Sequence, residues 1–235
     1  MYSFRTSIGP VDLAFTDRYG GVSAAPFAEL NLAVSGPDDE KAKQLNHRIL
    51  MDDFAPGDLL ADLYQVHGDA VVDAVPGLRP EADGIVTTTP GITLMVRAAD
   101  CVPVLLAGSG VVGAAHAGRK GMAAGVVTRT VERMRELGAD QIRAWIGPSI
   151  CGACYEVPAD MRDDVAAIEP ASASTTRRGT PAIDVAAGVR AQLERAGVVV
   201  DHVGGCTLES LDRYSFRRDG ESAGRLAGII RMAPQ

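Results

Sequence analysis

Strand-like and helix-like segments alternate along the whole chain, and no linker, internal repeat or low-complexity tract interrupts them. Apolar residues at helical spacing predict helices over 120–137, 158–168 and 185–196, and a further helix that starts at Pro37. Strands are expected at 11–16, 58–66, 92–98, 102–106, 111–115, 143–146, 198–203 and 226–232. This pattern predicts one domain over 1–235, of either the α/β or the α+β class.

The composition is that of a folded enzyme-sized domain. The 235 residues are 46% hydrophobic and 23% charged, which is enough to bury a substantial core. The formal net charge of -7 argues against nonspecific binding to nucleic acid or to an anionic membrane. No basic-then-apolar leader and no apolar run of about 20 residues is present. We therefore expect a cytoplasmic protein that acts on a small molecule, as a monomer or a homodimer.

Three residues that can bind a metal ion stand at the ends of predicted strands, beside small residues. His67 and His116 are two of only four histidines, and Cys101 is one of four cysteines. In a reducing compartment, cysteines are more often metal ligands or catalytic groups than disulfide partners. Two imidazoles, one thiolate and an open fourth position suit a catalytic zinc ion, which lowers the pKa of a water molecule to about 7.

A predicted hairpin would bring two of these residues together. A two-residue turn at Gly108–Ser109 would pair Cys101 directly with His116, with their Cα atoms about 5 Å apart. In this register Pro103 falls at a hydrogen-bonded position, which proline cannot complete. The hairpin therefore predicts that Cys101 and His116 are close, while its register stays open.

Two basic segments are candidates for binding phosphate. Gly118, Arg119 and Lys120 lead from His116 into a predicted helix, where free backbone N–H groups and two cations could hold an anion. Arg217 and Arg218 form a second pair, and guanidinium groups suit phosphate or carboxylate. Solvated charges at ordinary turns are the alternative interpretation of both segments.

A second set of residues could hold a structural metal ion. Cys151 and Cys154 form a C-x₂-C pair, and His202 and Cys206 follow about 47 residues later. That separation is much longer than in small zinc ribbons, so the motif is a weak indication of a metal site. It supports a non-catalytic alternative, namely a structural zinc or ligand-binding protein.

Nine short motifs, taken together and in order, resemble one family. They are GGVS at 20–23, LNL at 30–32, QVHG at 65–68, ADGIVT at 82–87, ADCVPV at 99–104, AHAG at 115–118, IGPSI at 146–150, CYEV at 154–157 and RRDG at 217–220. The ordered set is similar to the laccase-domain or polyphenol-oxidase-like family, also described as purine nucleoside phosphorylases and peptidoglycan editing factors. The motifs cover nearly the whole chain.

The resemblance implies a fold, an activity and a site. The fold is a single α+β domain of layered mixed sheets flanked by helices. The activity is metal-dependent phosphorolysis of adenosine, inosine and methylthioadenosine, with deamination of adenosine. The metal ligands are His67, Cys101 and His116; we also assign Asp100 to catalysis and Asn31 to substrate or phosphate binding. The family usually has Trp then Arg where this chain has Arg119 and Lys120. This chain therefore lacks an aromatic surface at that position on which a nucleobase could stack.

Two other enzyme classes fit the same residues. Two histidines and one cysteine match a mononuclear copper site, whereas the four histidines are too few for a multicopper centre. Zn²⁺ is the expected cofactor and Cu²⁺ is the alternative. A metal-free cysteine hydrolase, with Cys101 as nucleophile and His116 as base, would act on an amide or ester in cell-wall precursor metabolism.

Overall fold

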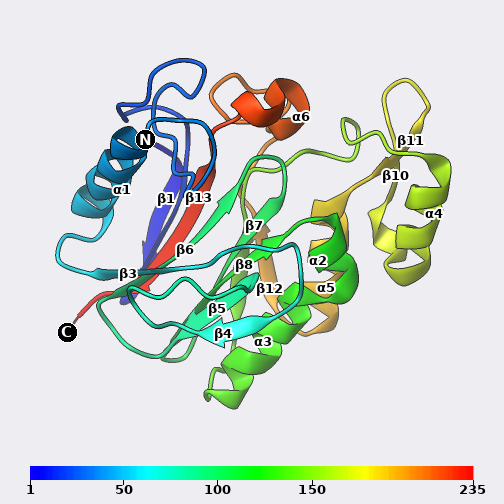
Figure 1. Ribbon diagram of the computed structural model, residues 1–235. Coiled ribbons are helices and arrows are strands. Elements are labelled where there is room, and N and C mark those ends of the chain that lie inside the picture. The colour runs from blue at the N-terminus through cyan, green and yellow to red at the C-terminus, as the bar shows by residue number, and fades with distance from the viewer. Residues whose placement is uncertain (235) are drawn as a thin grey trace.

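Two mixed β-sheets lie face to face at the centre of the molecule (Figure 1), whose residues 1–234 are described by a computed structural model. The five-stranded sheet consists, in spatial order, of β1 (Tyr2–Ile8), β2 (Val11–Thr16), β13 (Leu226–Met232), β6 (Ile92–Ala98) and β3 (Leu59–Asp62). The six-stranded sheet consists of β12 (Val199–His202), β9 (Arg143–Ile146), β7 (Val102–Gly108), β8 (Val111–Ala117), β5 (Gly84–Thr87) and β4 (Val71–Asp73).

Helices cover the outer faces of both sheets, so that the molecule has four layers. One outer face carries α1 (Glu40–Phe54); the other carries α2 (Arg119–Ala124), α3 (Val126–Glu136) and α5 (Val185–Arg195) (Figure 1). At one end of the molecule, α4 (Ala159–Ile168) packs on the small hairpin of β10 (Ala173–Thr175) and β11 (Pro181–Ile183). A short helix, α6 (Phe216–Asp219), precedes β13. None of the described helices is long and apolar enough to cross a membrane.

Three buried clusters correspond to the three interfaces between these layers. Phe15 and Ile230 of one sheet meet Leu105 and Trp145 of the other in the central cluster. A second cluster joins the six-stranded sheet to α2, α3 and α5, and a third joins the five-stranded sheet to α1. The expected single α+β domain of layered sheets and helices is confirmed, because each sheet buries both faces.

Most segments have the expected type, but several boundaries were wrong. The strands at 11–16, 92–98, 143–146 and 226–232 have the expected bounds, whereas β1 was not expected. The expected helix over 120–137 is two helices, because Gly125 adopts a left-handed conformation (φ 88°) between them. The first helix begins after Asp39 rather than at Pro37, since the Asp39 carboxylate accepts the Ala42 N–H and caps it.

The β7–β8 hairpin has a different register from the one that the turn argument predicted. Its last pair is Gly108 with Val111, so the turn lies at 109–110 and Pro103, not Cys101, is opposite His116. The His116 N–H donates to the carbonyl of Asp83, just before β5, instead of to β7 (2.8 Å). Pro103 and His116 therefore form a non-hydrogen-bonded pair, so the missing N–H of Pro103 removes no hydrogen bond between β7 and β8.

Candidate active site

His67, Cys101 and His116 meet where the chain passes from one sheet to the other. Cys101 lies in the β6–β7 connection, His116 lies on β8 and His67 lies in the loop after β3. One ligand atom from each of the three lies within 4.8 Å of the other two. The two imidazole rings are 4.9 Å apart between centroids and nearly perpendicular. His116 is buried and His67 is exposed, so the group is open on the His67 side.

A buried carboxylate orients this group. Asp83 Oδ1 lies 2.7 Å from His116 Nδ1, which leaves His116 Nε2 for Cys101 or a metal ion. The same carboxylate accepts the backbone N–H groups of Val66, His67 and Gly68 at 2.7 to 3.1 Å. Asp83 thus fixes the ring of one candidate ligand and the loop that carries another. Asp83 stands in the ADGIVT motif, where nothing in the sequence alone indicated a role for it.

The charges of Cys101 and His116 are coupled. Burial alone would raise the pKa of the Cys101 thiol, but the His116 charge and hydrogen bonds to His116 and His67 lower it to about 6. Burial would likewise lower the pKa of His116, but the Cys101 thiolate and Asp83 raise it to about 9. At neutral pH the metal-free protein therefore holds a thiolate, the form of cysteine that binds metals and attacks electrophiles.

An unusual backbone conformation presents Cys101. Asp100 has a φ of 91°, in the left-handed region that a non-glycine residue rarely adopts. Its carboxylate accepts the Thr207 hydroxyl (2.5 Å) and the Arg217 N–H (2.6 Å), and its carbonyl accepts the Ile150 N–H (3.0 Å). Asp100 therefore ties the Cys101 turn to α6 and to the loops that contain Ile150 and Thr207.

Two glycines allow α2 to approach the candidate ligands. A Cβ at Gly118 would lie 2.7 Å from His67 Cδ2 and 3.2 Å from Cys101 Sγ. A Cβ at Gly121 would lie 2.8 Å from the Gly68 carbonyl oxygen. Only glycine leaves room at these two positions, because real Cβ atoms do not come so close to other heavy atoms.

The three candidate ligands open into a cavity of about 790 Å³. Its wall contains four arginines and three aromatic side chains, which are Arg97, Arg119, Arg217, Arg225, Tyr64, Tyr155 and Phe216. Arg97 Nη1 and Arg119 Nε are buried and have no hydrogen-bond partner within residues 1–234. A cavity with spare guanidinium donors and aromatic faces suits a ligand that has both an anion and a flat ring.

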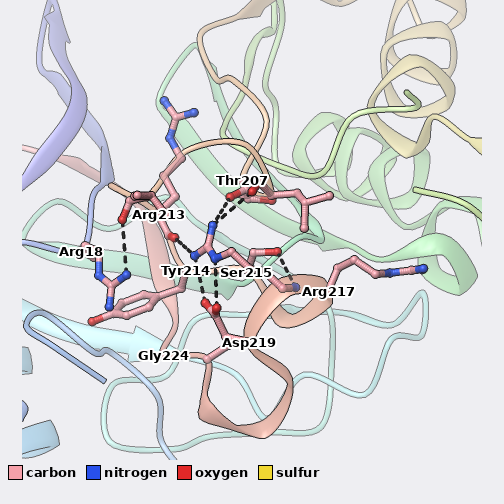
Figure 2. A network of polar contacts seen from close by, with 12 residues as sticks. Arg18, Thr207, Arg213, Tyr214, Ser215, Arg217, Asp219 and Gly224 are labelled. Atoms are coloured by element: carbon pink, nitrogen blue, oxygen red, sulfur yellow. Dashed lines mark hydrogen bonds and ion pairs between the residues drawn. The ribbon is translucent and has the colours of Figure 1, made fainter. Parts of the chain in front are cut away.

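Four residues assigned to substrate or phosphate binding lie outside the wall of this cavity, namely Gly118, Lys120, Asn31 and Arg218. Lys120 is exposed on α2, and the buried Asn31 amide donates to Asp38 (2.8 Å). The Arg218 guanidinium donates to four backbone carbonyls, those of Thr207, Leu208, Ser210 and Arg213, and pairs with Asp219. Figure 2 shows Thr207, Arg213 and Asp219 around these contacts, while Arg217 extends away from them. Arg218 therefore supports the 207–213 loop.

A second group of metal-binding side chains also forms. Cys151, Cys154 and Cys206 come together as the sequence suggested, with all ligand atoms of the group within 4.8 Å of one another. The fourth member is Glu209, and the expected His202 lies apart on β12. Sequence spacing missed Glu209 because an exposed glutamate carries no signal of its own.

The fold and the first site define a single-domain α+β protein with a candidate metal centre at the junction of two sheets. The chain belongs to the family described as multi-copper polyphenol oxidoreductase laccase, whose model matches residues 12–233. The resemblance drawn from the nine motifs is thereby confirmed.

Curated relatives and solved structures match nearly the whole chain. It is 49% identical to a purine nucleoside phosphorylase of Streptomyces coelicolor (98% of this chain, 99% of the relative). It is 42% identical to a purine nucleoside phosphorylase of Corynebacterium glutamicum (94% of each). The Neisseria meningitidis protein NMB0706 has the same fold, with a TM-score of 0.87, 32% identity and coverage of 98% and 99%. YfiH of Bacillus licheniformis gives a TM-score of 0.85 at 28% identity, covering 95% of this chain and 93% of YfiH.

Proposed function

We propose that this chain is a zinc-dependent purine nucleoside phosphorylase that acts on adenosine, inosine and methylthioadenosine and also deaminates adenosine. The names of the curated relatives support the phosphorylase activity. The observation that carries the proposal is one cavity containing both a His/Cys/His group and two arginines with unpaired buried donors. Such a cavity offers a cation site and an anion site side by side.

The donor set fits zinc. Two imidazole nitrogens and one thiolate sulfur are typical zinc ligands, and the metal-free pKa of Cys101 keeps the sulfur anionic at neutral pH. Asp83 holds His116 in the tautomer whose Nε2 can bind. His67, Cys101 and His116 would therefore hold the ion; when bound, it supplies a Lewis acid for phosphorolysis and for deamination.

The remaining residues of the wall bind and orient the substrates. We assign phosphate to Arg119 and Arg97, because a guanidinium donates in pairs to phosphate oxygens. Tyr155 and Phe216 present rings on which a purine can stack, and they replace the aromatic surface missing at Arg119. In phosphorolysis, a phosphate oxygen bonds to ribose C1′ as the bond from C1′ to the purine nitrogen breaks. Asp100 holds the Cys101 turn in place for this step.

The test compares metal content and activity in ligand variants. We expect His67→Ala, Cys101→Ala and His116→Ala each to lose one equivalent of zinc by elemental analysis. Each should also lose the conversion of inosine and phosphate to hypoxanthine and ribose 1-phosphate. His202→Ala is the matched control, because His202 is an exposed histidine outside both groups. Full zinc content in all three ligand variants would refute the site, and an inactive zinc-loaded parent would refute the phosphorylase activity.

Deamination is tested separately. With phosphate omitted, the zinc-loaded protein should convert adenosine to inosine and ammonia, because that reaction consumes water and no phosphate. Production of adenine alone, and only when phosphate is present, would show that the site performs phosphorolysis without deamination.

One observation favours a second candidate, a metal-free cysteine hydrolase. Cys101, His116 and Asp83 stand in the order of nucleophile, base and orienting carboxylate. If this candidate is correct, protein stripped of metal keeps its activity on an ester or amide, and alkylation of Cys101 abolishes it. The family description keeps a copper oxidase as an alternative, and the same elemental analysis distinguishes copper from zinc.

A further inference from the structure

Cys151 and Cys154 lie at the two ends of a tight turn. The N–H groups of Cys154 and Tyr155 both donate to the Cys151 carbonyl, at 2.9 and 3.0 Å. A Cβ at Gly152 would lie 2.5 Å from Ser174 Oγ, so only glycine fits inside the turn. The turn therefore presents two sulfurs to the same side from a backbone that is already fixed.

The loop that carries Cys206 is fastened to this turn by its backbone. Ser149 donates to the Gly205 carbonyl (3.3 Å) and accepts the Thr207 N–H (3.0 Å). Next to these contacts, the Cys151 N–H points to Cys206 Sγ at 3.5 Å. Two segments about 55 residues apart thus bring three sulfurs together by ordinary backbone pairing.

We propose that Cys151, Cys154, Cys206 and Glu209 bind a second zinc ion, separate from the group at His67. The three cysteines of this group are free of disulfides. Their sulfurs and one carboxylate oxygen of Glu209 lie within 4.8 Å of one another. A zinc–sulfur bond is about 2.3 Å long, so a small inward movement of the side chains completes a tetrahedron. Three thiolates select zinc over magnesium or calcium, and four protein ligands leave no open position, as in structural zinc sites.

An exposed cation lies beside the group, where it would compete with a metal ion for the same side chains. The Arg177 guanidinium contacts Cys154 Sγ (3.6 Å) and pairs with Glu209. Arg177 is exposed, so it can swing into solvent when a metal ion takes its place.

A metal ion here would hold one wall of the main cavity. Ile150 and Tyr155, which flank the turn, both line that cavity, and Arg217 lies over the Tyr155 ring at 5.0 Å. On the other segment, Thr207 follows Cys206 and donates to the Asp100 carboxylate. The second ion therefore crosslinks the two loops that position the substrate-binding wall, without touching the substrate.

Cobalt titration of the full-length Cys101→Ala chain tests the proposal. This variant lacks the only thiolate of the first group, so any thiolate-to-cobalt charge-transfer absorption must come from the second. In reducing buffer we expect each chain to bind one Co²⁺ ion and to show this absorption. Addition of Zn²⁺ should displace the Co²⁺ and remove the absorption. Adding the substitution Cys206→Ser to this variant should abolish the charge-transfer absorption. Adding Ala153→Ser, which is in the same turn as Cys151 and Cys154 but replaces no ligand, should leave the absorption unchanged.

Two variants at the surface keep the proposal testable if Cys206→Ser fails to fold. Glu209→Gln should weaken Co²⁺ binding, and Arg177→Ala should tighten it at least about fivefold, because a competing positive charge is removed. If Arg177 and Glu209 formed only a structural ion pair, Co²⁺ would bind equally tightly to both of these variants. No charge-transfer absorption in the reduced Cys101→Ala chain overturns the proposal, whatever the outcome at the first group.

Discussion

At the level of single residues, one carboxylate organises the candidate active site. Asp83 is fully buried and accepts from His116 and from three successive backbone N–H groups of the 66–68 segment. Removing a carboxylate with this many charge-assisted hydrogen bonds would release two of the three candidate ligands together. The sequence shows Asp83 only as one polar residue in a run of small and apolar residues.

Arg119 and Lys120 are neighbours in the sequence, but from the structure we expect Arg119 to bind phosphate and Lys120 not to bind it. Arg119 lines the cavity with an unpaired Nε, whereas Lys120 is exposed on α2. We expect Arg119→Ala to raise the KM for phosphate about tenfold or more, since a charge-assisted pair contributes about 1.5–3 kcal/mol, and to change the KM for inosine less. Lys120→Ala is the matched control and should leave both constants near those of the parent.

The coupling of Cys101 to His116 predicts how the metal-free protein reacts with iodoacetamide. Because the pKa of Cys101 is lowered to about 6, its thiolate is already formed at pH 7. The rate of alkylation of Cys101, followed by mass spectrometry of the chelator-treated protein, should fall with decreasing pH with a midpoint near pH 6. Added Zn²⁺ should protect Cys101. A midpoint near the ordinary cysteine pKa of about 8.5 would contradict the thiolate–imidazolium pair.

At the level of elements, the junction between β8 and α2 places His116 beside the helix that closes the site. A Cβ at Gly118 would meet His67 Cδ2 and Cys101 Sγ. Gly118→Ala should therefore displace His67 and lower zinc affinity, measured by competition with a chromophoric chelator, while circular dichroism shows an unchanged fold. Ala123→Ser, on the same helix and away from the ligands, is the control. Unchanged affinity in Gly118→Ala would mean that the His67 loop moves freely.

Periodicity predicted the buried elements well and the connections poorly. Strands with both faces covered, such as β6 and β13, are mostly apolar, and their bounds were predicted correctly although each contains an arginine. The break between α2 and α3 depends on the left-handed conformation of Gly125, and a single glycine does not show whether a helix stops or continues. The hairpin register depended on which glycine took the turn, and proximity of Cys101 to His116 was predicted although their pairing was wrong.

The candidate site, too, could be predicted from the sequence only in part. The group of His67, Cys101 and His116 could be predicted mainly because their motifs resemble the family, and because histidine and cysteine are rare in this chain and stand at strand ends. The cavity wall could not, because Tyr64, Arg97 and Arg225 come from segments far apart in the sequence and carry no motif of their own. Arginine clusters were misleading in part, since composition does not distinguish Arg217, which faces the cavity, from Arg218, which binds backbone carbonyls.

At the level of the whole molecule, an ion-pair network under the cavity supports the five-stranded sheet. Asp62 on β3 pairs with the buried Arg97 on β6 and with Arg79. Burial alone would raise the pKa of Asp62, but the two arginines hold it below its usual value. A carboxyl with a lowered folded-state pKa stabilises the fold above its unfolded pKa, and this contribution is lost as the pH falls through the folded-state pKa.

We expect Asp62→Asn to lower the free energy of unfolding by about 3–5 kcal/mol, because it leaves the Arg97 charge buried with no carboxylate partner. Arg79→Ala is the control; its side chain is 44% exposed, so its loss should cost about 1 kcal/mol or less. Urea denaturation at pH 7 measures both. Equal effects of the two substitutions would show that the buried pair adds nothing beyond a surface ion pair.

The position of β13 has a consequence for how the chain folds during synthesis. The last strand in the described part of the chain, Leu226–Met232, lies in the middle of its sheet, between β2 and β6. The six-stranded sheet, encoded between residues 71 and 202, can form while the ribosome is still at work, but the other sheet stays open until β13 emerges. Arg217 and Arg225 of the cavity wall are translated just before it. A nascent chain therefore carries its candidate metal ligands long before it can enclose a substrate.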